Sequence, residues 1–477
     1  MRYKTIIGLE IHVELMTNTK IFCNCANEFG GEANSHCCPV CLGLPGAIPI
    51  LNKRVLEFAI KAGTAFNSDI SNYIKMDRKN YFYSDLTKGF QISQDDFPIC
   101  SDGYIELELE NGETKKVNLN RIHIEEDTGK QIHTENDETL LDYNRAGVPL
   151  IEIVTKPDIS SGEEARLFLE KLKATLKYIE VSDCKMEEGS LRCDVNINVV
   201  DTEIGQKTKI TEIKNLNSFR SVVKAIEFEE ERHIELLNKG ENTAKETRRW
   251  DEMKSETIVM RSKGGASDYR FAVEGDIPPF TIEDSFIKQI QDNMPELPHE
   301  KKERFMNEYD LNQYDAGVLT QSKDIATFFE ETVKNINDTK LVSNWVMGDV
   351  LRRLNEEELE IDSLKFDAKA LADLITLVKD GKINNNTGKK VLRDMFETGK
   401  DPKEIVKEQG LIQISDTSEL EGIVDIILDE NEQSIIDYKN GKDRVIGFLV
   451  GQIMKKTRGK ANPQLVNQLL LKKIKDR

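Results

Sequence analysis

Residues 8–15 (GLEIHVEL) carry side chains well suited to chemistry, because two carboxylates flank an imidazole in an alternating stretch. Side chains two residues apart in a strand point to the same face, so Glu10, His12 and Glu14 share one face and aliphatic residues the other. Such a trio indicates a metal site or an acid/base site. Taken alone, the stretch is also typical of a solvated edge strand that happens to hold a histidine.

The same arrangement recurs in four later stretches that alternate or are strongly apolar. Their polar groups are His123, Glu125 and Asp127; Glu152; Arg192, Asp194, Asn196 and Asn198; and Glu212 and Lys214. If these strands pair in one curved sheet, they line a single cleft with hard oxygen ligands and a few cations. That composition suits Mg²⁺ and phosphate.

The composition indicates a globular protein of several domains. The chain has 477 residues, of which 38% are hydrophobic and 32% charged, and this length predicts roughly two to four domains. No apolar run approaches the roughly 20 residues that span a bilayer. Glu10 and His12 interrupt what would be the apolar region of a signal peptide. We therefore expect a cytoplasmic protein with no membrane association.

The net charge is −19, which argues against a surface coated with nucleic acid, but the charge is uneven. Residues 437–477 hold eleven Lys and Arg against three Asp, a net +8 on an acidic body. A basic tail of this kind is expected where one module contacts a polyanion. The alternative is that basic helices merely solvate the C-terminus.

Five of the eight cysteines lie between residues 23 and 41. Cys23 and Cys25, then Cys38 and Cys41, have the spacing of a four-thiolate zinc site with a knuckle at each end. In an intracellular chain such a cluster indicates metal rather than disulfides. Free cysteines left from a lost site are the alternative. A site with four protein ligands leaves no coordination position for substrate, so the zinc would have a structural role and would cross-link the loop of residues 17–49.

Elements with helical or hairpin patterns position these groups. Residues 52–66 have helical spacing, and residues 78–94 form a polar, aromatic stretch more typical of a binding loop than of a linker. Asn111-Gly112 fits a type I′ hairpin turn before the strand of Glu125. After Pro279 the pattern predicts helices only, with a second boundary near Gly399.

Six motifs in order resemble one family, the B subunits of tRNA-dependent amidotransferases. They are GLEIHVEL, CPVCLGLPG (residues 38–46), HIEED (123–127), LDYNRAGVPLIEIVT (141–155), MEEGSLRCDVN (186–196) and EIKNLNSFR (212–220). The resemblance runs to the end of the chain, where GKANPQLVNQLL (459–470) is similar to the family's YqeY-like tail.

The resemblance implies an α+β fold. A catalytic cradle built on a mainly antiparallel sheet is expected over residues 1–293, with the cysteine-rich loop 17–49. An all-α helical domain is expected over 294–400 and a basic, tRNA-contacting YqeY-like tail over 401–477. For the tail, the expected tRNA contacts are Lys455, Lys456, Arg458 and Lys460.

The resemblance also implies an activity. In the cradle, ATP and Mg²⁺ phosphorylate the side-chain carboxylate of Glu-tRNA(Gln) or Asp-tRNA(Asn), and ammonia then displaces phosphate. Our hypothesis assigns Glu10, His12, Glu125 and Glu152 to Mg²⁺, with Asp194 and Asn196 as ligands or orienting groups. It assigns Lys79, Arg192 and Lys214 to phosphate, and Tyr81 and Asp85 to the aminoacyl end. Positioning and charge neutralisation are what phosphoryl transfer mainly needs.

Ammonia must come from another protein. The chain has no Cys at position 2 and no Ser-Ser-Lys context of an amidase. The family uses a glutaminase A subunit, together with a small C subunit that braces the two, in a heterotrimer. The rival functions are a non-catalytic tRNA-binding scaffold of the same complex and a free-standing ligase.

Some positions depart from the family pattern. Ser84 and Thr87 stand where prolines are usual, Ser267 where histidine is usual, and Ala272-Val273 where Phe-Pro is usual. These departures raise the hypothesis of a diverged second copy with altered preference, and the sequence leaves the choice between Glu and Asp open.

Overall fold

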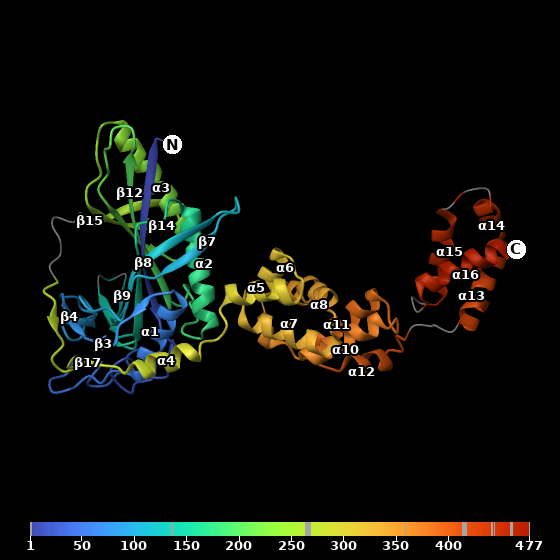
Figure 1. The fold of residues 1–477 in the computed structure, drawn as a ribbon, viewed down its shortest axis with the longest axis horizontal. Helices are drawn as coiled ribbons and strands as arrows, with labels where there is room; N and C mark the ends of the chain where they lie inside the picture. The colour runs from blue at the N-terminus through green and yellow to red at the C-terminus, as the bar shows by residue number, and fades with distance from the viewer. Residues whose placement is uncertain are drawn as a thin grey trace. The chain divides into compact units, whose positions relative to one another are not determined.

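The computed structural model describes residues 2–134, 136, 138–262, 269–357, 359–412, 417–439, 442, 444–457 and 461–476. The chain divides into two compact units, Met1–Leu297 and Pro298–Arg477. The fold is α+β, as the sequence predicts, with the strands in the first unit (Figure 1). The proposed division of function at residues 293 and 400 stays a prediction. No helix in the described part of the chain has the length and apolar character needed to cross a bilayer.

A ten-stranded sheet forms the first unit, in the order β15-β14-β13-β12-β1-β11-β8-β6-β2, and β7 pairs with β8. Its strands are β1 (Tyr3–Glu14), β2 (Asp69–Ile70), β6 (Cys100–Ser101), β7 (Tyr104–Glu108), β8 (Thr114–Glu126), β11 (Pro149–Thr155), β12 (Leu191–Asp201), β13 (Thr211–Leu216), β14 (Glu246–Asp251) and β15 (Glu256–Ser262). Among the described residues of this sheet, only β13 and β14 pair in parallel. The first strand therefore lies in the middle, between strands from much later in the chain.

Three smaller sheets complete the unit. They are β9 (Lys130–His133) with β10 (Thr139–Asp142); β4 (Asp77–Asn80) between β5 (Phe90–Ser93) and β16 (Ala272–Val273); and β3 (Tyr73–Ile74) with β17 (Phe280–Thr281). The turn at Asn111-Gly112 differs from the predicted type I′ turn. Gly112 has a positive φ of 82° but Asn111 does not, so the loop closes with one left-handed residue.

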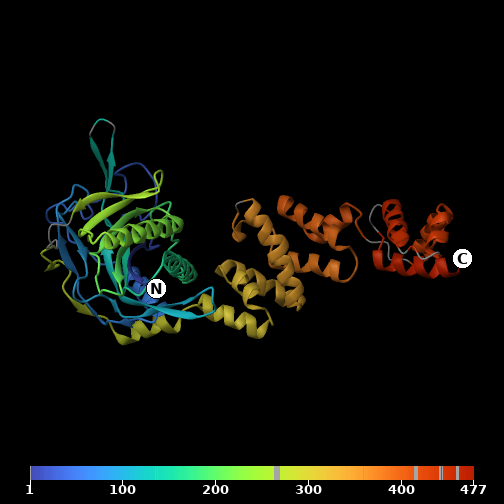
Figure 2. The same ribbon diagram turned by 90° about the horizontal axis from the view of Figure 1, so that it is seen from above.

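Helices cover the apolar face of the large sheet. Asn52 caps α1 (Lys53–Ala65), Ser161 caps α2 (Gly162–Tyr178) and Ser218 caps α3 (Phe219–Asn238), each through its side chain. Figure 2 shows α2 and α3 side by side. Their aliphatic residues join Ile7, Leu9, Ile11 and Val13 of β1 in one core. The opposite face of β1 is thereby left to Glu10, His12 and Glu14. The short α4 (Asp284–Asp292) packs against α1.

The second unit is helical in its described residues. Its elements are α5 (Pro298–Glu308), α6 (Gln313–Leu319), α7 (Lys323–Ile336), α8 (Thr339–Trp345), the π-helical η1 (Val346–Leu351), α9 (Arg352–Glu356), the 3₁₀ turn η2 (Ile361–Ser363), α10 (Ala368–Lys379), α11 (Asn385–Thr398), α12 (Pro402–Glu408), α13 (Thr417–Asp429), α14 (Glu432–Lys439), α15 (Arg444–Lys456) and α16 (Pro463–Asp476). Two hydrophobic clusters stabilise it, one from Phe305 to Val406 and one from Leu420 to Ile474.

Candidate functional site

Three adjacent strands bring the predicted polar groups to one face of the sheet. In the antiparallel register, His12 of β1 lies opposite Glu152 of β11 and opposite Arg192 of β12. Glu10 lies opposite Asp194. Strand pairing thus brings the polar side chains that alternate along each strand together into one continuous polar surface.

The imidazole–carboxylate cluster consists of His12, His123, Glu125 and Glu152. His12 Nε2 lies 3.3 Å from Glu125 Oε1 and 3.5 Å from Glu152 Oε2. His123 Nε2 lies 3.6 Å from Glu125 Oε2 and 3.2 Å from Glu152 Oε2. Ser93 Oγ donates to Glu125 at 3.2 Å. His123, Glu125 and Glu152 are buried, while the His12 side chain keeps 25% exposure at the open side.

The cluster is strongly coupled electrostatically. Burial lowers the pKa of His12, but the bond to Glu125 and the charge of Glu152 outweigh it and raise that pKa to about 9. Burial also opposes ionisation of Glu125, yet the two imidazoles hold its pKa well below the ordinary value. The two carboxylates likewise raise the pKa of His123 against its burial, so the charges of the cluster favour protonated imidazoles.

The donor set fits a divalent cation. Ligand atoms of His12, Glu125 and Glu152 all lie within 4.8 Å of one another. A divalent cation would supply two positive charges to Glu125 and Glu152, and would favour a neutral His12 that is free to ligate. Carboxylate oxygens suit Mg²⁺, and an added imidazole also suits Mn²⁺. His123 Nδ1 is buried without a hydrogen-bond partner among the described residues.

Glu10 belongs to a second group, the acidic cluster of Glu10, Asp194 and Glu212. One ligand atom of each lies within 4.8 Å of the others. Lys214 Nζ pairs with Asp194 and lies 3.2 Å from Glu212 Oε1. Asn196 donates to Glu10 at 2.8 Å. Burial, then the charge of Glu152, raises the pKa of Glu10. The structure thus divides the predicted four-residue Mg²⁺ set between two neighbouring clusters.

Arg192 is held by a carboxylate at the other end of the cleft. Its Nη2 lies 2.6 Å from Asp127 Oδ2, and Arg145 Nε lies 3.5 Å from the same oxygen. Burial, together with the charge of Asp127, raises the pKa of nearby Glu14 to about 8. Arg192 Nε is buried with no partner in the described residues, so part of the guanidinium keeps hydrogen-bonding capacity.

The stretch predicted as a binding loop, residues 78–94, is a loop only in its middle, because residues 78–80 belong to β4 and residues 90–93 form β5. The loop between the two strands begins beside the imidazole–carboxylate cluster, where Tyr81 feels the charge of Glu125. Tyr81 is half-buried and donates to Gln91 at 3.3 Å. Burial, with the charge of Glu125 second, raises the pKa of Tyr81. Asp85 accepts from Thr128 at 3.2 Å. Lys79 Nζ lies 5.0 Å from the centroid of the Tyr269 ring and has no carboxylate partner among the described residues. Lys79 is therefore a cation available to an anionic substrate.

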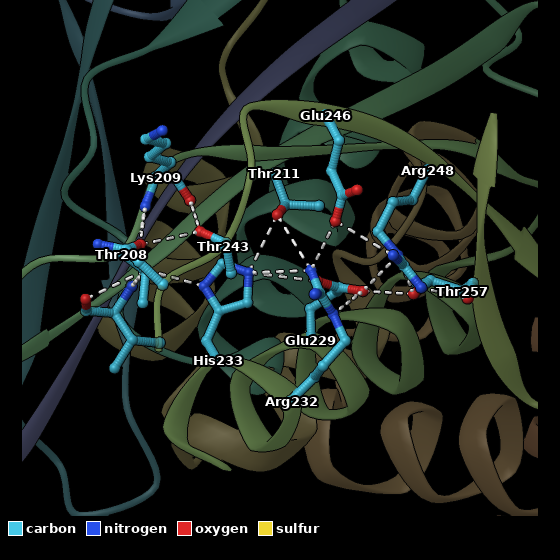
Figure 3. A network of polar contacts seen from close by, with 12 residues as sticks. Thr208, Lys209, Thr211, Glu229, Arg232, His233, Thr243, Glu246, Arg248 and Thr257 are labelled. Carbon is cyan, nitrogen blue, oxygen red and sulfur yellow. Dashed lines mark hydrogen bonds and ion pairs between the residues drawn. The ribbon is translucent and has the colours of Figure 1, made fainter. Parts of the chain in front are cut away.

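A buried polar network beneath α3 fixes β13, the strand that bears Glu212 and Lys214 (Figure 3). Glu229 is fully buried and receives Arg232 Nη2 at 2.6 Å, Arg248 Nε at 3.0 Å and His233 Nε2 at 3.3 Å. His233 also bonds Thr211 Oγ1 at 3.0 Å. Burial opposes the ionisation of Glu229, but these bonds outweigh burial and lower the pKa of Glu229 to about 2. Since Thr211 faces α3, its neighbour Glu212 must face the cleft.

The four predicted zinc ligands converge. Sulfur atoms of Cys23, Cys25, Cys38 and Cys41 lie within 4.8 Å of one another. Cys41 Sγ is 3.7 Å from Cys25 Sγ and 3.6 Å from Cys38 Sγ. Tetrahedral zinc with bonds of about 2.3 Å needs sulfurs about 3.8 Å apart. The geometry fits a structural zinc ion.

Buried contacts fix the loop around these thiols. Lys20 is fully buried and donates to His36 O and Ala146 O, each at 2.8 Å. Hydrogen bonds, first from Cys23, lower the pKa of the Cys41 thiol to about 4. A thiolate is the form that binds metal.

We expect Cys41→Ser to abolish stoichiometric zinc binding, while Cys37→Ser retains it. Both thiols lie in the same loop, but Cys37 lies outside the four-sulfur group. Elemental analysis of the purified chain tests this, with thermal unfolding in the presence of a chelator as a second readout. Equal zinc content in the two variants would contradict the assignment.

The structure describes the residues that depart from the family pattern, with the exception of Ser267, which lies outside the described residues. Ser84 O accepts from Tyr143 Oη at 2.9 Å, and Thr87 Oγ1 donates to Cys41 O at 2.8 Å. Ala272 and Val273 form β16, which pairs with β4. The Thr87 hydroxyl joins the binding loop to the cysteine loop, which a proline could not do.

Of the predicted tail contacts, Lys455 and Lys456 are exposed near the end of α15. Lys456 Nζ lies 3.0 Å from Glu430 Oε1. Arg458 and Lys460 lie outside the described residues, so only the first two are placed.

His123 and Glu212 were not among the predicted site residues. The sequence could have indicated both, because each lies two residues from a predicted site residue and so on the same strand face: His123 with Glu125, and Glu212 with Lys214. Burial of His123 and its distance to Glu152 become evident only once β8 and β11 are paired.

Two family models match the sequence. One, described as the GatB/GatE catalytic domain, matches residues 5–288, and the other, described as the GatB domain, matches residues 327–474.

Several named proteins are similar over nearly the whole chain. The B subunit of the aspartyl/glutamyl-tRNA(Asn/Gln) amidotransferase of Clostridium tetani (strain Massachusetts / E88) is 57% identical over 477 residues, 99% of each chain. A protein of the same name from Finegoldia magna (strain ATCC 29328 / DSM 20472 / WAL 2508) is 57% identical and covers 99% of this chain and 100% of that one. Another, from Clostridium botulinum (strain Okra / Type B1), is 56% identical over 98% of each chain.

Proposed function

We propose, from the premise that this chain belongs to the family of amidotransferase B subunits, that it activates the side-chain carboxylate of a misacylated tRNA for amidation. Family membership supports a role in tRNA-dependent amide transfer within a multi-subunit enzyme. The observation that carries the catalytic assignment is the convergence of His12, Glu125 and Glu152 from three strands around one point. We place the reaction in the cytoplasm, with Glu-tRNA(Gln), Asp-tRNA(Asn) or both as substrate.

The chemistry requires two displacements. A carboxylate resists attack by ammonia because oxide is a very poor leaving group. One carboxylate oxygen therefore attacks the γ-phosphorus of ATP, and the bond to the β-phosphate oxygen breaks to release ADP. Ammonia then adds to the acyl carbon, loses a proton, and inorganic phosphate leaves with the bonding electron pair. The product is the side-chain amide.

The residues divide these tasks. His12, Glu125 and Glu152 would hold Mg²⁺, which supplies charge neutralisation for phosphoryl transfer. Lys79 would approach the transferred phosphate, since no carboxylate among the described residues pairs with it. Arg192 and Lys214 would orient Asp127 and Asp194 and turn their remaining N–H groups toward phosphate. Tyr81 and Asp85 would frame the aminoacyl end beside Glu125.

Ammonia would reach this site from a partner. We propose a glutaminase A subunit as its source and a small C subunit as the brace of the complex. The decisive experiment reconstitutes the three chains and assays both misacylated tRNAs with and without ATP. ATP-dependent formation of Gln-tRNA or Asn-tRNA, absent without the glutaminase when glutamine is the donor, supports the proposal. Glutamate release from glutamine by this chain alone would contradict the division of labour.

The tail is proposed to contact tRNA. Replacing Lys455 and Lys456 with Gln should weaken tRNA binding about tenfold and reduce the slope of log affinity against log salt by about two, because each phosphate contact releases counterions. Filter binding at several salt concentrations measures both quantities. The control replaces two exposed lysines of the other helical cluster, Lys369 and Lys390. An unchanged salt slope in the tail variant would count against the tail as anchor.

A further inference from the structure

Lys20, in the loop that follows β1, is a fully buried lysine. Its Nζ donates to three main-chain carbonyl oxygens, at 2.8 Å to His36 O and Ala146 O and at 3.3 Å to Tyr143 O. These bonds use the three N–H groups of the ammonium but supply no negative charge. Among the described residues no carboxylate pairs with Lys20. A buried ammonium without an anion is unfavourable, so Lys20 needs another kind of counter-ion.

The Lys20 side chain lies against the cysteine cluster. A β-carbon on Gly147 would lie 3.7 Å from both Lys20 Cδ and Cys41 Cβ, so these two side chains converge there. Lys20 N also donates to Cys25 O at 3.0 Å. The hydrogen bond from Cys23, and in the same direction the charge of Lys20, lower the pKa of the Cys41 thiol. The ammonium is therefore within electrostatic reach of the sulfur group.

The charge of a zinc complex with four thiolates matches this ammonium. Such a complex is a dianion, because the metal neutralises only half of the thiolate charge. A buried cation beside a buried anion offsets part of the cost of desolvating both. Groups that contact the ligands without touching the metal commonly change metal affinity by about 10- to 100-fold. Lys20 has the charge, the burial and the position that this role requires.

Lys20 also connects the cysteine cluster to the cleft. The carbonyls of residues 143 and 146, which it holds, flank Arg145. Arg145 Nε lies 3.5 Å from Asp127 Oδ2, and the same oxygen is paired with Arg192 at 2.6 Å. Next to the held carbonyls, Gly147 N donates to Asp127 O at 2.9 Å. A short path through the main chain therefore joins Lys20 to the charged pair at the end of the cleft.

We propose that Lys20 is the buried counter-ion of a zinc tetrathiolate in the four-cysteine site, and that it couples the presence of zinc to the placement of Asp127 and Arg192. Zinc would fix the four sulfurs around one point and add to the negative charge that faces the ammonium. It would thereby strengthen the hold on Lys20 and, through Lys20, on the carbonyls beside Arg145. Lys20 is a positioning residue, because its N–H groups all bond to carbonyls. The zinc part of the inference is independent of the proposed amidation, and a consequence for catalysis rests on it.

The test measures zinc binding by the full chain with Lys20→Met and Lys20→Gln. Met keeps the length of the side chain without its charge, and Gln keeps an uncharged N–H donor. We expect the dissociation constant for zinc, measured by competition with a chromophoric chelator, to rise about 10- to 100-fold in both variants. The control is Asn27→Ala in the same loop, which removes neutral bonds to Leu15 O at 2.9 Å and Thr17 O at 3.1 Å. It should change the constant by less than about threefold.

Cobalt(II) in place of zinc gives a readout that packing alone would not move. A positive charge beside a sulfur atom stabilises the electrons of that atom. The sulfur-to-cobalt charge-transfer band should therefore lie at longer wavelength in both Lys20 variants than in the wild type and in Asn27→Ala. Zinc affinities close to that of the wild type in the folded Lys20 variants would overturn the counter-ion role, and so would an unshifted band. A wild-type chain that binds neither metal would overturn it together with the zinc assignment.

Amide hydrogen exchange tests the coupling, and its first step needs no variant. Removing zinc from the wild-type chain should speed exchange in the peptide of residues 143–148, which holds the Gly147 amide, and not in α7 of the second unit. Lys20→Gln should speed exchange in this peptide with zinc bound, and removing zinc from that variant should add little. Equal exchange in the wild type with and without zinc would overturn the coupling, and so would additive effects of the substitution and of zinc removal.

Activity is a separate readout in the reconstituted complex. Lys20→Gln saturated with zinc should lose about tenfold in kcat, with an unchanged KM for misacylated tRNA, because Arg192 is proposed to act on phosphate and not on the tRNA. An unchanged kcat would overturn the catalytic consequence. A wild-type complex that forms no amide would reject the proposed function instead, and the metal affinities and exchange rates would still decide the role of Lys20.

Discussion

Glu125→Gln is expected to reduce transamidation by the reconstituted complex roughly 10²- to 10³-fold. Glu125 lies within reach of both His12 and His123, and it is buried. Its replacement by a neutral amide removes a charged ligand from the proposed divalent site while keeping the side-chain volume. The loss should appear mainly in kcat and should be accompanied by weaker binding of Mn²⁺, used as the spectroscopic probe.

The control for this prediction is Glu106→Gln, an exposed carboxylate on β7 of the same large sheet. It should leave both activity and Mn²⁺ binding unchanged. Full transamidation by Glu125→Gln in a folded complex would instead favour the rival function, a non-catalytic tRNA-binding scaffold. A binding assay with misacylated tRNA distinguishes the two cases, since tRNA affinity should be retained in the variant.

Glu229→Ala is expected to destabilise the first unit by about 3 to 5 kcal/mol. Glu229 is fully buried among Arg232, Arg248 and His233 (Figure 3). Removing the carboxylate leaves Arg232 and Arg248 to share Glu246 as their remaining carboxylate partner among the described residues, and removing one partner from a buried charge network is the costly way to break it. Urea unfolding followed by tryptophan fluorescence measures the effect, because Trp250 lies on β14 beside Arg249. Glu231→Ala, exposed on the same helix, is the control and should change stability by less than about 0.5 kcal/mol.

The same carboxylate makes a pH-dependent contribution. The pKa of Glu229 falls from an ordinary value of 4.5 to about 2 on folding. A depressed folded pKa stabilises the folded state at a pH above the unfolded value, and this stabilisation is lost as the pH falls through the folded value. About 3 kcal/mol should therefore disappear between about pH 4.5 and pH 2 in the wild type and not in Glu229→Ala. Identical acid unfolding of both proteins would contradict the role of the network.

Alternation along single strands predicted much of the candidate site. The cleft-facing positions of Glu10, His12 and Glu125 follow from a period of two, which is a local property of the sequence. Glu152 was found in another way, as the one ionisable group in an apolar stretch. The helix starts were also predictable, because Ser161 and Ser218 cap their helices through local hydrogen bonds.

The neighbours of each strand could not be predicted from local pattern. Glu10 joins Asp194 because β12 pairs with β1 across a long stretch of sequence, and Glu212 follows because β13, the next strand, pairs with β12. The parallel pairing of β13 with β14 and the network around Glu229 depend on how α3 packs, which no alternation encodes. The turn at Asn111 likewise differs by one dihedral angle that the dipeptide alone does not determine.

The central place of β1 has a consequence for biosynthesis. Its partners are β11 and β12, the latter ending at Asp201. At roughly 5 to 20 residues per second, the ribosome needs about 10 to 40 s after making Glu14 before both neighbours exist. Throughout that interval the earliest strand lacks at least one of its two hydrogen-bonding neighbours. Nascent chains stalled before residue 201 should therefore bind chaperones that hold unfolded chains. Nascent chains stalled after the end of α3 should no longer bind these chaperones.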